Sequence, residues 1–282
     1  MPFNENWTLI LKPKTGWFDI HLGELWRYRD LISLFVRRDF VAFYKQTVLG
    51  PFWYLIQPIF TTLVFTIIFG RIAKIPTDGV PPFLFYMAGN VAWAYFAGCL
   101  TGTSNTFVAN AGIFGKVYFP RLTMPLAKVI TDLLKFSIQL TLFLGFLAYF
   151  MLSGADVHFS PWMLYVPVLI LQMALLGLGF GILISSLTTK YRDLTFLVGF
   201  GMQLWMYATP VVYPLSQIPE QYRTLYMLNP MASVVETFRM SFLGVGSIEP
   251  MHVILGWAVT VVVLFTGIVL FSRIEKTFMD TV

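Results

Sequence analysis

Residues 157–189 read VHFSPWMLYVPVLILQMALLGLGFGILISSLTT and contain no aspartate, glutamate, lysine or arginine. A helix needs about 20 consecutive apolar residues to cross the hydrocarbon core of a membrane, so this stretch is long enough for one crossing. The other charge-free stretches of sufficient length lie at 46–70, 79–115, 136–155, 194–219 and 250–272. Together these stretches predict an all-α integral membrane protein with six membrane-spanning helices, in a transmembrane domain covering 51–273. The expected spans are about 52–72, 82–106, 130–152, 161–187, 194–213 and 251–272.

The composition excludes several other classes of protein. Of the 282 residues, 19 are lysine or arginine and 14 are aspartate or glutamate, so 12% are charged, whereas a soluble domain carries about 25%. Hydrophobic residues make up 57% of the chain, and the mean hydropathy is +0.72. A soluble protein of this length could not bury so much apolar surface, and a disordered chain would be far more polar. A disulfide scaffold is excluded because Cys99 is the only cysteine.

Lysine and arginine are concentrated on one side of the predicted membrane domain. The segments that six crossings place on the side of the two termini hold 15 of these residues, and the opposite segments hold 4. Positively charged residues favour the cytoplasmic side, so we expect both termini there, with 274–282 as a cytoplasmic tail. The net charge of +5 then reflects orientation and contact with anionic lipid headgroups, and we expect no nucleic acid as a partner.

The cytoplasmic segment 1–50 contains an apolar pattern with three- and four-residue spacing over 22–44, which predicts an amphipathic helix. Such a helix lies in the membrane interface and turns its basic residues toward the lipid headgroups. The alternative is a soluble helix packed on a partner protein, and one helix could serve both purposes. The basic residues expected at the headgroups are Arg27, Arg29, Arg37 and Arg38.

Residues 214–246 are too polar for a crossing, yet their window 224–235 has 12 residues without a charge. This window is too short to cross, and Pro230 interrupts it. The pattern predicts an external re-entrant helical hairpin, which needs protein around its irregular backbone and could act as a gate. An ordinary folded external loop is the alternative. The expected gate residues are Met227, Leu228, Met231, Glu236 and Arg239, the last two as an exposed pair on one helix face.

The sequence lacks motifs for catalysis and for nucleotide or metal binding. Gly115 and Lys116 resemble the end of a phosphate-binding loop, but the required glycine and hydroxyl positions hold Asn110 and Val117. The three histidines are scattered, so we expect no metal site, no cofactor and no catalytic residue in this chain. Ion coupling is disfavoured because the centres of the predicted spans hold almost no ionisable residues.

Charged and small residues also mark particular helix surfaces. Lys128, Asp132 and Lys135 recur at four- and three-residue spacing and predict a cytoplasmic extension of the third span that faces water, headgroups or a partner. We interpret Asp132 and Glu236 as charges at helix ends. The glycine pairs that permit close contact between helices are Gly98–Gly102 and Gly177–Gly181.

Aromatic residues are abundant, with 28 Phe, 13 Tyr and 8 Trp, or 17% of the chain. Near the ends of spans, Trp and Tyr commonly form belts at the membrane interface. The more specific hypothesis is a surface that contacts sugars, because ring faces can contact sugar C–H groups while polar edges keep hydrogen bonds. The residues that could line such a glycan path are Trp53, Phe60, Trp205, Tyr207 and Tyr213.

Several short segments, in order along nearly the whole chain, resemble one known family. They are WRYRDL at 26–31, RRDF at 37–40, YK at 44–45, LGPFW at 49–53, QP at 57–58, KVYFPR at 116–121 with Pro125, YRDL at 191–194, TPVVYP at 209–214, IP at 218–219, LNP at 228–230, FR at 238–239 and the tail residues Phe271, Glu275, Phe278 and Asp280. The chain resembles the permease subunit of ABC-2 type exporters for bacterial polysaccharides. Its opening residues 12–19 are most similar to the Wzm-type O-antigen permeases.

The resemblance implies a homodimer in the bacterial inner membrane, with two copies of a cytoplasmic ABC ATPase that bind ATP and Mg²⁺. The substrate would be a polysaccharide on a polyprenyl-diphosphate lipid, most like O-antigen. The resemblance also implies that 22–44 and 115–121 contact the ATPase. The coupling residues would be Lys116, Val117, Tyr118, Phe119, Pro120 and Arg121, with Tyr118 and Phe119 as exposed apolar anchors.

Three other classes of membrane protein are alternatives to an O-antigen permease. The nearest alternative function is an ABC-2 permease for teichoic acid, capsule, a drug or a simple lipid. The lipid-linked material that accumulates in cells lacking the chain would distinguish these permeases from an O-antigen permease. A membrane glycosyl or acyl transferase would need a catalytic acid or histidine near the membrane surface, and no such constellation is visible. A passive channel would conduct without ATP.

Overall fold

The computed structural model describes residues 22–45, 48–188, 191 and 193–281, and these residues form helices without a single strand. The prediction of an all-α protein is therefore confirmed. The helices are α1 (Leu22–Arg27), α2 (Arg29–Lys45), α3 (Trp53–Phe65), α4 (Pro82–Thr103), α5 (Thr106–Phe114), α6 (Thr123–Leu152), α7 (Val166–Thr188), α8 (Leu194–Tyr207), α9 (Glu220–Tyr226), α10 (Pro230–Leu243) and α11 (Pro250–Thr281).

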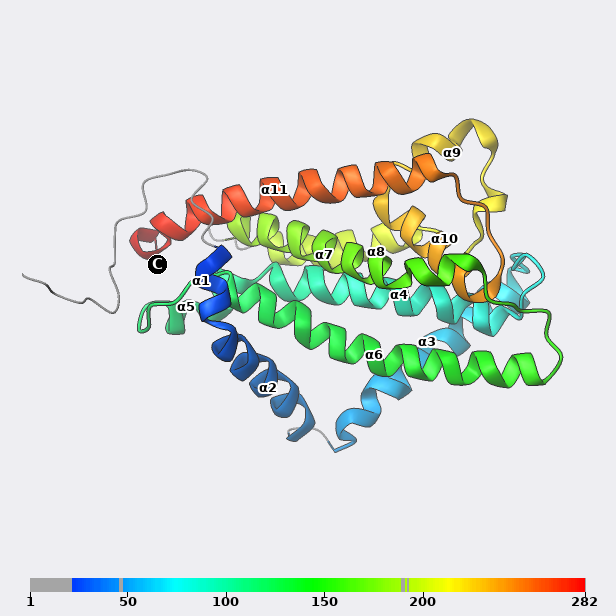
Figure 1. The fold of residues 1–282 in the computed structure, drawn as a ribbon, viewed down its shortest axis with the longest axis horizontal. Helices are drawn as coiled ribbons and strands as arrows, with labels where there is room; N and C mark the ends of the chain where they lie inside the picture. Colours follow the sequence, from blue (N-terminus) through cyan, green and yellow to red (C-terminus); the bar gives the residue numbers. More distant parts are fainter. Residues whose placement is uncertain (1–21, 46–47, 189–190, 192, 282) are drawn as a thin grey trace, which may run out of the picture.

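The long helices lie side by side in one elongated bundle (Figure 1). One end, here called the α1 end, holds α1, α5 and the last turns of α11. The opposite end, called the α9 end, holds α9 and the connections 73–81, 153–160 and 244–249. The first and last described helices thus end on the same side, as an even number of crossings requires.

Five helical stretches of the described residues are long and apolar enough to cross a membrane. They are Gly50–Ile72, Pro82–Thr103, Thr123–Leu152, Pro161–Thr188 and Pro250–Ile274. The expected span at 194–213 instead forms α8, which has 14 residues and is about 21 Å long at 1.5 Å per residue. This length is less than the hydrocarbon core, about 30 Å thick, so α8 alone does not complete a crossing.

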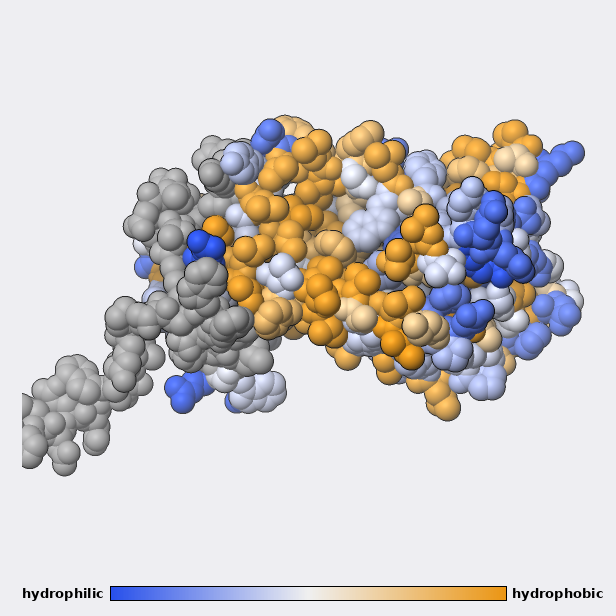
Figure 2. All heavy atoms as spheres, turned by 90° about the horizontal axis from the view of Figure 1, so that it is seen from above, coloured by the Kyte–Doolittle hydropathy of each residue, from blue (hydrophilic) through white to orange (hydrophobic). Residues whose placement is uncertain are grey.

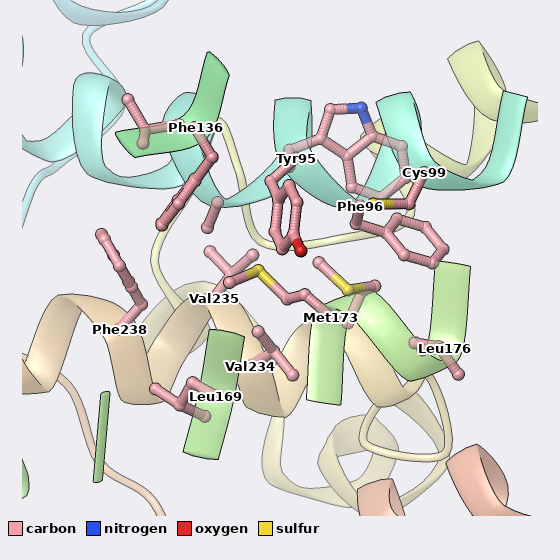
Figure 3. Packing of buried hydrophobic residues seen from close by; sticks show 14 of the residues in the cluster. Tyr95, Phe96, Cys99, Phe136, Leu169, Met173, Leu176, Val234, Val235 and Phe238 are labelled. Atoms are coloured by element: carbon pink, nitrogen blue, oxygen red, sulfur yellow. The ribbon is translucent and has the colours of Figure 1, made fainter. Parts of the chain in front are cut away.

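Helix α4 is the central element of the bundle. Of its most apolar window, 78% is buried, compared with 17% for α6 and α11. Its side chains Tyr95, Phe96 and Cys99 face residues of α7 and α10, such as Met173 and Val235 (Figure 3). The other long helices surround α4 and present apolar residues outward. A broad hydrophobic band covers the middle of the molecule, and hydrophilic residues gather at the α9 end (Figure 2).

The two glycine pairs predicted to permit close helix contact both do so within this chain. A Cβ atom at Gly177 would lie 2.6 Å from Cβ of Cys99, and one at Gly181 would overlap Oγ1 of Thr103. These glycines bring α7 against α4. On the other side of α4, Gly98 and Gly102 lie against charged side chains of α6.

We predict that Gly181→Val lowers the melting temperature of the purified protein, because the added methyl groups force α7 away from α4. Overpacking of this kind costs about 1–3 kcal/mol. The control is Gly145→Ala on α6, where no atom lies within 4 Å of the position of the new Cβ. Equal melting temperatures for the two variants would show that α4 and α7 are not packed as described.

Candidate functional site

The chain leaves helical geometry directly after α8. Residues 208–214 form turns and bends, and Thr209, Pro210, Val211 and Val212 are buried. A short 3-10 turn, Leu215–Gln217, then leads to α9 and α10. The predicted hairpin at 214–246 therefore contains two helices, of which α9 is mostly exposed and α10 is almost entirely buried.

Helix α10 begins inside the bundle and runs outward to the α9 end. At its start, the indole N–H of Trp205 donates to the side-chain oxygen of Asn229 at 3.0 Å, and the Trp205 ring contacts Trp93 of α4 at a centroid distance of 6.3 Å. Near its end, the guanidinium of Arg239 lies 3.6 Å from the ring centre of Phe85. Phe85 lies eight residues before Trp93 on α4, or about 12 Å nearer the α9 end.

Asn229 ties the end of α8 to the start of α10. Its side-chain nitrogen donates to the carbonyl oxygen of Ala208 at 3.0 Å and to the hydroxyl of Thr209 at 2.9 Å. Its side-chain oxygen accepts from the backbone N–H of Met231 at 3.1 Å and thereby caps α10. One amide group thus pairs with polar groups at the end of α8 and at the start of α10.

Arg239 supplies hydrogen-bond donors for the irregular segment between α8 and α10. Its side chain is buried, and it donates hydrogen bonds to the backbone carbonyls of Pro210, Val211 and Phe85. Gly89 of α4 makes room for it, because a Cβ atom there would lie 2.6 Å from Nη2 of the arginine. The sequence predicted Arg239 as an exposed gate residue, and the structure shows it as an internal clamp between α4, α10 and 210–211.

The predicted pair between Glu236 and Arg239 is present, with 4.0 Å between Oε2 and Nη1. The prediction that this pair is exposed is wrong, since the two side chains are 3% and 1% exposed. Burial raises the pKa of Glu236 to about 7, and the positive charge of Arg239 opposes this rise. Glu236 also faces Asp78 and Arg223, and it accepts a hydrogen bond from the backbone of Ser247.

The other expected gate residues divide into two groups. Met227 and Met231 are fully buried, and Met227 packs with Leu215 and Ala232 beneath α9. Leu228 is 51% exposed. The methionines therefore hold the hairpin on the bundle, while Leu228 lies on its surface.

The structure does not bring all five glycan-path residues to one surface. Trp53, Phe60 and Tyr207 are exposed. Trp205 is half-buried among aromatic rings, and Tyr213 is half-buried with its hydroxyl donating to the carbonyl of Tyr207 at 2.8 Å. The first three rings remain available to lipid or to a transported molecule, whereas Trp205 and Tyr213 stabilise the broken helix region.

The expected coupling segment 115–121 forms an irregular connection at the α1 end. Lys116, Val117 and Tyr118 are exposed, Arg121 is partly exposed and Pro120 is buried. The expectation that Phe119 is an exposed anchor is wrong. Phe119 is buried against Phe35 of α2 and Phe114 of α5, with ring centroids 5.8 Å and 5.6 Å away.

The predicted helix at 22–44 is confirmed as helical, with an interruption at Tyr28 that separates α1 from α2. Phe40 of α2 stacks on Tyr54 of α3 at 6.2 Å, so the helix is fixed to the bundle. The four basic residues assigned to the headgroups, Arg27, Arg29, Arg37 and Arg38, are all exposed.

The interpretation of Asp132 as a water-facing charge at a helix end is wrong. Its side chain is 5% exposed, and Oδ1 lies 2.7 Å from Nζ of Lys135 and 3.4 Å from Nζ of Lys128. Glu236 was assigned to a helix end as well, and it is also buried. Both carboxylates belong to internal charge clusters. Among the described residues, no group of three His, Cys, Asp or Glu side chains is placed to hold a metal ion.

These features define a class of protein: an all-α, multi-pass membrane protein with a broken helix at one end and an exposed, basic connection at the other. The family model for ABC-2 type transporters matches residues 30–243, and the chain belongs to this family. An O-antigen export system permease protein RfbA from Myxococcus xanthus is 29% identical over 265 residues, covering 92% of this chain and 98% of the relative.

Two further relatives extend the comparison. An O-antigen export system permease protein RfbA from Klebsiella pneumoniae is 28% identical over 254 residues, covering 89% of this chain and 94% of the relative. The polysialic acid transport protein KpsM of Escherichia coli is 23% identical over 252 residues, covering 88% of this chain and 95% of the relative. The similarity therefore extends over about nine-tenths of the chain in each case.

We predict that Arg239→Ala destabilises the protein by several kcal/mol, because it leaves the buried carbonyls of Pro210 and Val211 without donors. Arg239→Lys retains the charge but cannot reach both carbonyls with a forked group, so its melting temperature should be intermediate. The control is Arg71→Ala, because Arg71 is exposed. Wild-type stability in Arg239→Ala would contradict the clamp.

The buried carboxyl of Glu236 predicts a particular pH dependence. Glutamate in an unfolded chain ionises near 4.5, and burial raises the pKa of Glu236 to about 7 in the folded protein. Between these values the folded state holds the extra proton, so stability should fall as the pH rises from about 5 to about 7.5. Glu236→Gln should flatten this part of the curve of melting temperature against pH. An unchanged slope in the variant would assign the pH dependence to other groups.

Proposed function

We propose that this chain is the permease subunit of an ATP-driven exporter that moves a polyprenyl-diphosphate-linked polysaccharide across the bacterial inner membrane. The polysaccharide is most similar to lipopolysaccharide O-antigen. The observation that carries the proposal is the similarity of about nine-tenths of the chain to permeases named for O-antigen export. The exposed aromatic rings of Trp53, Phe60 and Tyr207 could contact the C–H groups of a sugar chain.

The energy for export has to come from a separate subunit in this proposal. The sequence carries no phosphate-binding loop, so ATP and Mg²⁺ would be bound by a cytoplasmic ABC ATPase. Two ATPase copies would act on a homodimer of this chain, with the α1 end in the cytoplasm. The exposed residues Val117 and Tyr118 offer an apolar contact at that end, next to α2.

The broken region supports a path from the α1 end to the α9 end with six crossings. In this proposal α8 enters from the cytoplasmic side, and residues 208–214, of which 209–212 are buried, carry the chain onward to α9. Helices α9 and α10 would then form an external re-entrant gate, since α10 starts in the interior and ends at the α9 end. Irregular backbone at membrane depth requires surrounding protein and internal hydrogen bonds, which α4, Asn229 and Arg239 provide.

Export of a capsular polysaccharide is the second candidate, and the similarity to the polysialic acid transport protein favours it over a drug or a simple lipid. The decisive experiment is controlled depletion of this chain, followed by mass spectrometry of the lipid-linked glycans in the inner membrane. Accumulation of a polyprenyl-diphosphate glycan, with loss of the same glycan from the cell surface, is expected. An unchanged glycan pool together with normal surface polysaccharide would contradict the proposed function.

The coupling segment gives a prediction that separates partner contact from internal packing. Tyr118→Asp should reduce co-purification of the ATPase and export, with normal amounts of the permease, because Tyr118 is 55% exposed. An apolar anchor at an interface can contribute about 2 kcal/mol or more. Phe119→Asp should instead lower the amount of folded permease, because Phe119 is buried against α2. Normal ATPase binding and normal export in Tyr118→Asp would rule out this segment as the contact.

A further inference from the structure

An apolar groove of about 740 Å³ runs along the surface between α3 and α6. On α6 it is lined by Ile138, Thr141, Leu142, Gly145 and Phe146, and on α3 by Leu55. The α6 residues follow three- and four-residue spacing, so they form one face of the helix. Tyr149 continues this face by another turn, which gives the groove a length of about 17 Å along α6.

Lys135 lies on the same face of α6, one turn before the groove begins. Its ammonium group is 2.7 Å from Oδ1 of Asp132 and 5.8 Å from the ring centre of Tyr54, the residue that precedes Leu55 on α3. Lys128 approaches the same carboxylate oxygen at 3.4 Å. The groove therefore has a charged cluster at the end that faces the α1 end of the bundle.

This cluster carries two positive charges and one negative charge. The two lysine side chains are partly accessible, at 29% and 27% exposed, whereas the carboxylate between them is 5% exposed. The second oxygen of Asp132 is buried without a hydrogen-bond partner. Asp132 holds the two ammonium groups near one another, where they would otherwise repel, and leaves a net positive charge for an anion.

The cluster also lies at the depth that suits a lipid headgroup. Residues 136–152 of α6 carry no charge and form 17 residues of helix, or about 25 Å. This charge-free part corresponds to the hydrocarbon core and holds the whole groove, whereas Lys128 and Lys135 come just before it. Lysine side chains at this level reach the interface with their charged ends.

We propose that the groove and the Lys128–Asp132–Lys135 cluster bind the polyprenyl-diphosphate end of the substrate, with the diphosphate at the lysines and the prenyl chain along α6. The assignment rests on the proposed function and names the site where the permease holds its substrate's lipid. Two lysines suit a headgroup with more than one negative charge. A single groove along one helix face fits one hydrocarbon chain, whereas an ordinary phospholipid brings two.

Gly145 offers a way to block the groove without disturbing the fold. No atom lies within 4 Å of the position that a Cβ would take there, so a large side chain would extend into the groove. Leu144 provides the matched control, because it is exposed on the same helix and points about 100° away from Gly145. Gly145→Trp and Leu144→Trp should therefore both fold, and only the first should obstruct the chain.

The experiment uses the full chain with its ATPase in lipid nanodiscs. The probe is a polyprenyl diphosphate with a photoactivatable diazirine in its chain, and phosphatidylglycerol with the same group serves as comparison. The prenyl probe should label peptides covering 138–149, and excess unlabelled polyprenyl diphosphate should displace it. Gly145→Trp and Lys135→Gln should each reduce labelling about tenfold, the effect of one lost charge-assisted contact or of a filled groove. Leu144→Trp should label normally.

Three outcomes of the labelling experiment would overturn the proposal. Equal labelling by phosphatidylglycerol that polyprenyl diphosphate does not displace would make the groove an ordinary lipid contact. A disulfide between two copies that carry Thr141→Cys would make it a dimer contact. Labelling that is absent or insensitive to Gly145→Trp would exclude the groove as the site. If depletion of the chain still causes glycan accumulation in these cases, the proposed function stands and only the location of the lipid site fails.

Discussion

The hydrogen bonds from Arg239 and Asn229 to the backbone of 208–211 are the interactions on which the rest of the structure depends. Residues 208–214 leave helical geometry inside the bundle, so their carbonyl groups lose the partners that a helix would supply. In a membrane no water replaces those partners, and each unpaired group costs several kcal/mol. Arg239 donates hydrogen bonds to the carbonyl groups of Pro210 and Val211, and Asn229 donates to the carbonyl group of Ala208.

The arginine can occupy this position because α4 is shaped to receive it. Gly89 leaves space for the guanidinium, and Phe85 lies against its face at 3.6 Å. Glu236 compensates part of the buried charge. Through these contacts α8, α10 and α4 form one packed unit at the α9 end. We expect any opening at the α9 end to move α9 and residues 216–219, which are mostly exposed, whereas Leu215 is buried with Met227 and Ala232.

A chain of aromatic contacts joins the opposite end of the molecule to the bundle. Phe119 of the exposed connection contacts Phe35 of α2, and Phe40 of the same helix stacks on Tyr54 of α3. The ammonium group of Lys135 lies 5.8 Å from the centre of the same Tyr54 ring. A force applied by a partner at Tyr118 would therefore reach α2, α3 and the proposed lipid site through packed side chains. This series of packed side chains is a physical route for coupling.

The helices were predictable from the sequence, because charge-free stretches of sufficient length have few other stable states. The early end of α8 could also have been found, since Pro210 removes a backbone donor and disfavours helix in the residue before it. The burial of Asp132 and Arg239 could not have been predicted from the sequence, because spacing along a helix does not show which face another helix covers. Phe119 was misassigned for the same reason: its partner Phe35 is distant in sequence.

The central inference is that Arg239 keeps 210–212 buried while the chain continues to the α9 end. It is tested most directly by single cysteines at Val212 and Ser216 in a Cys99→Ser background, with an impermeant thiol reagent added outside intact cells. We predict that Ser216→Cys reacts, that Val212→Cys is protected, and that Val212→Cys becomes reactive when Arg239→Gln is added. Reaction of Ser216→Cys only from the cytoplasm, or equal reaction of Val212→Cys with and without Arg239, would contradict it.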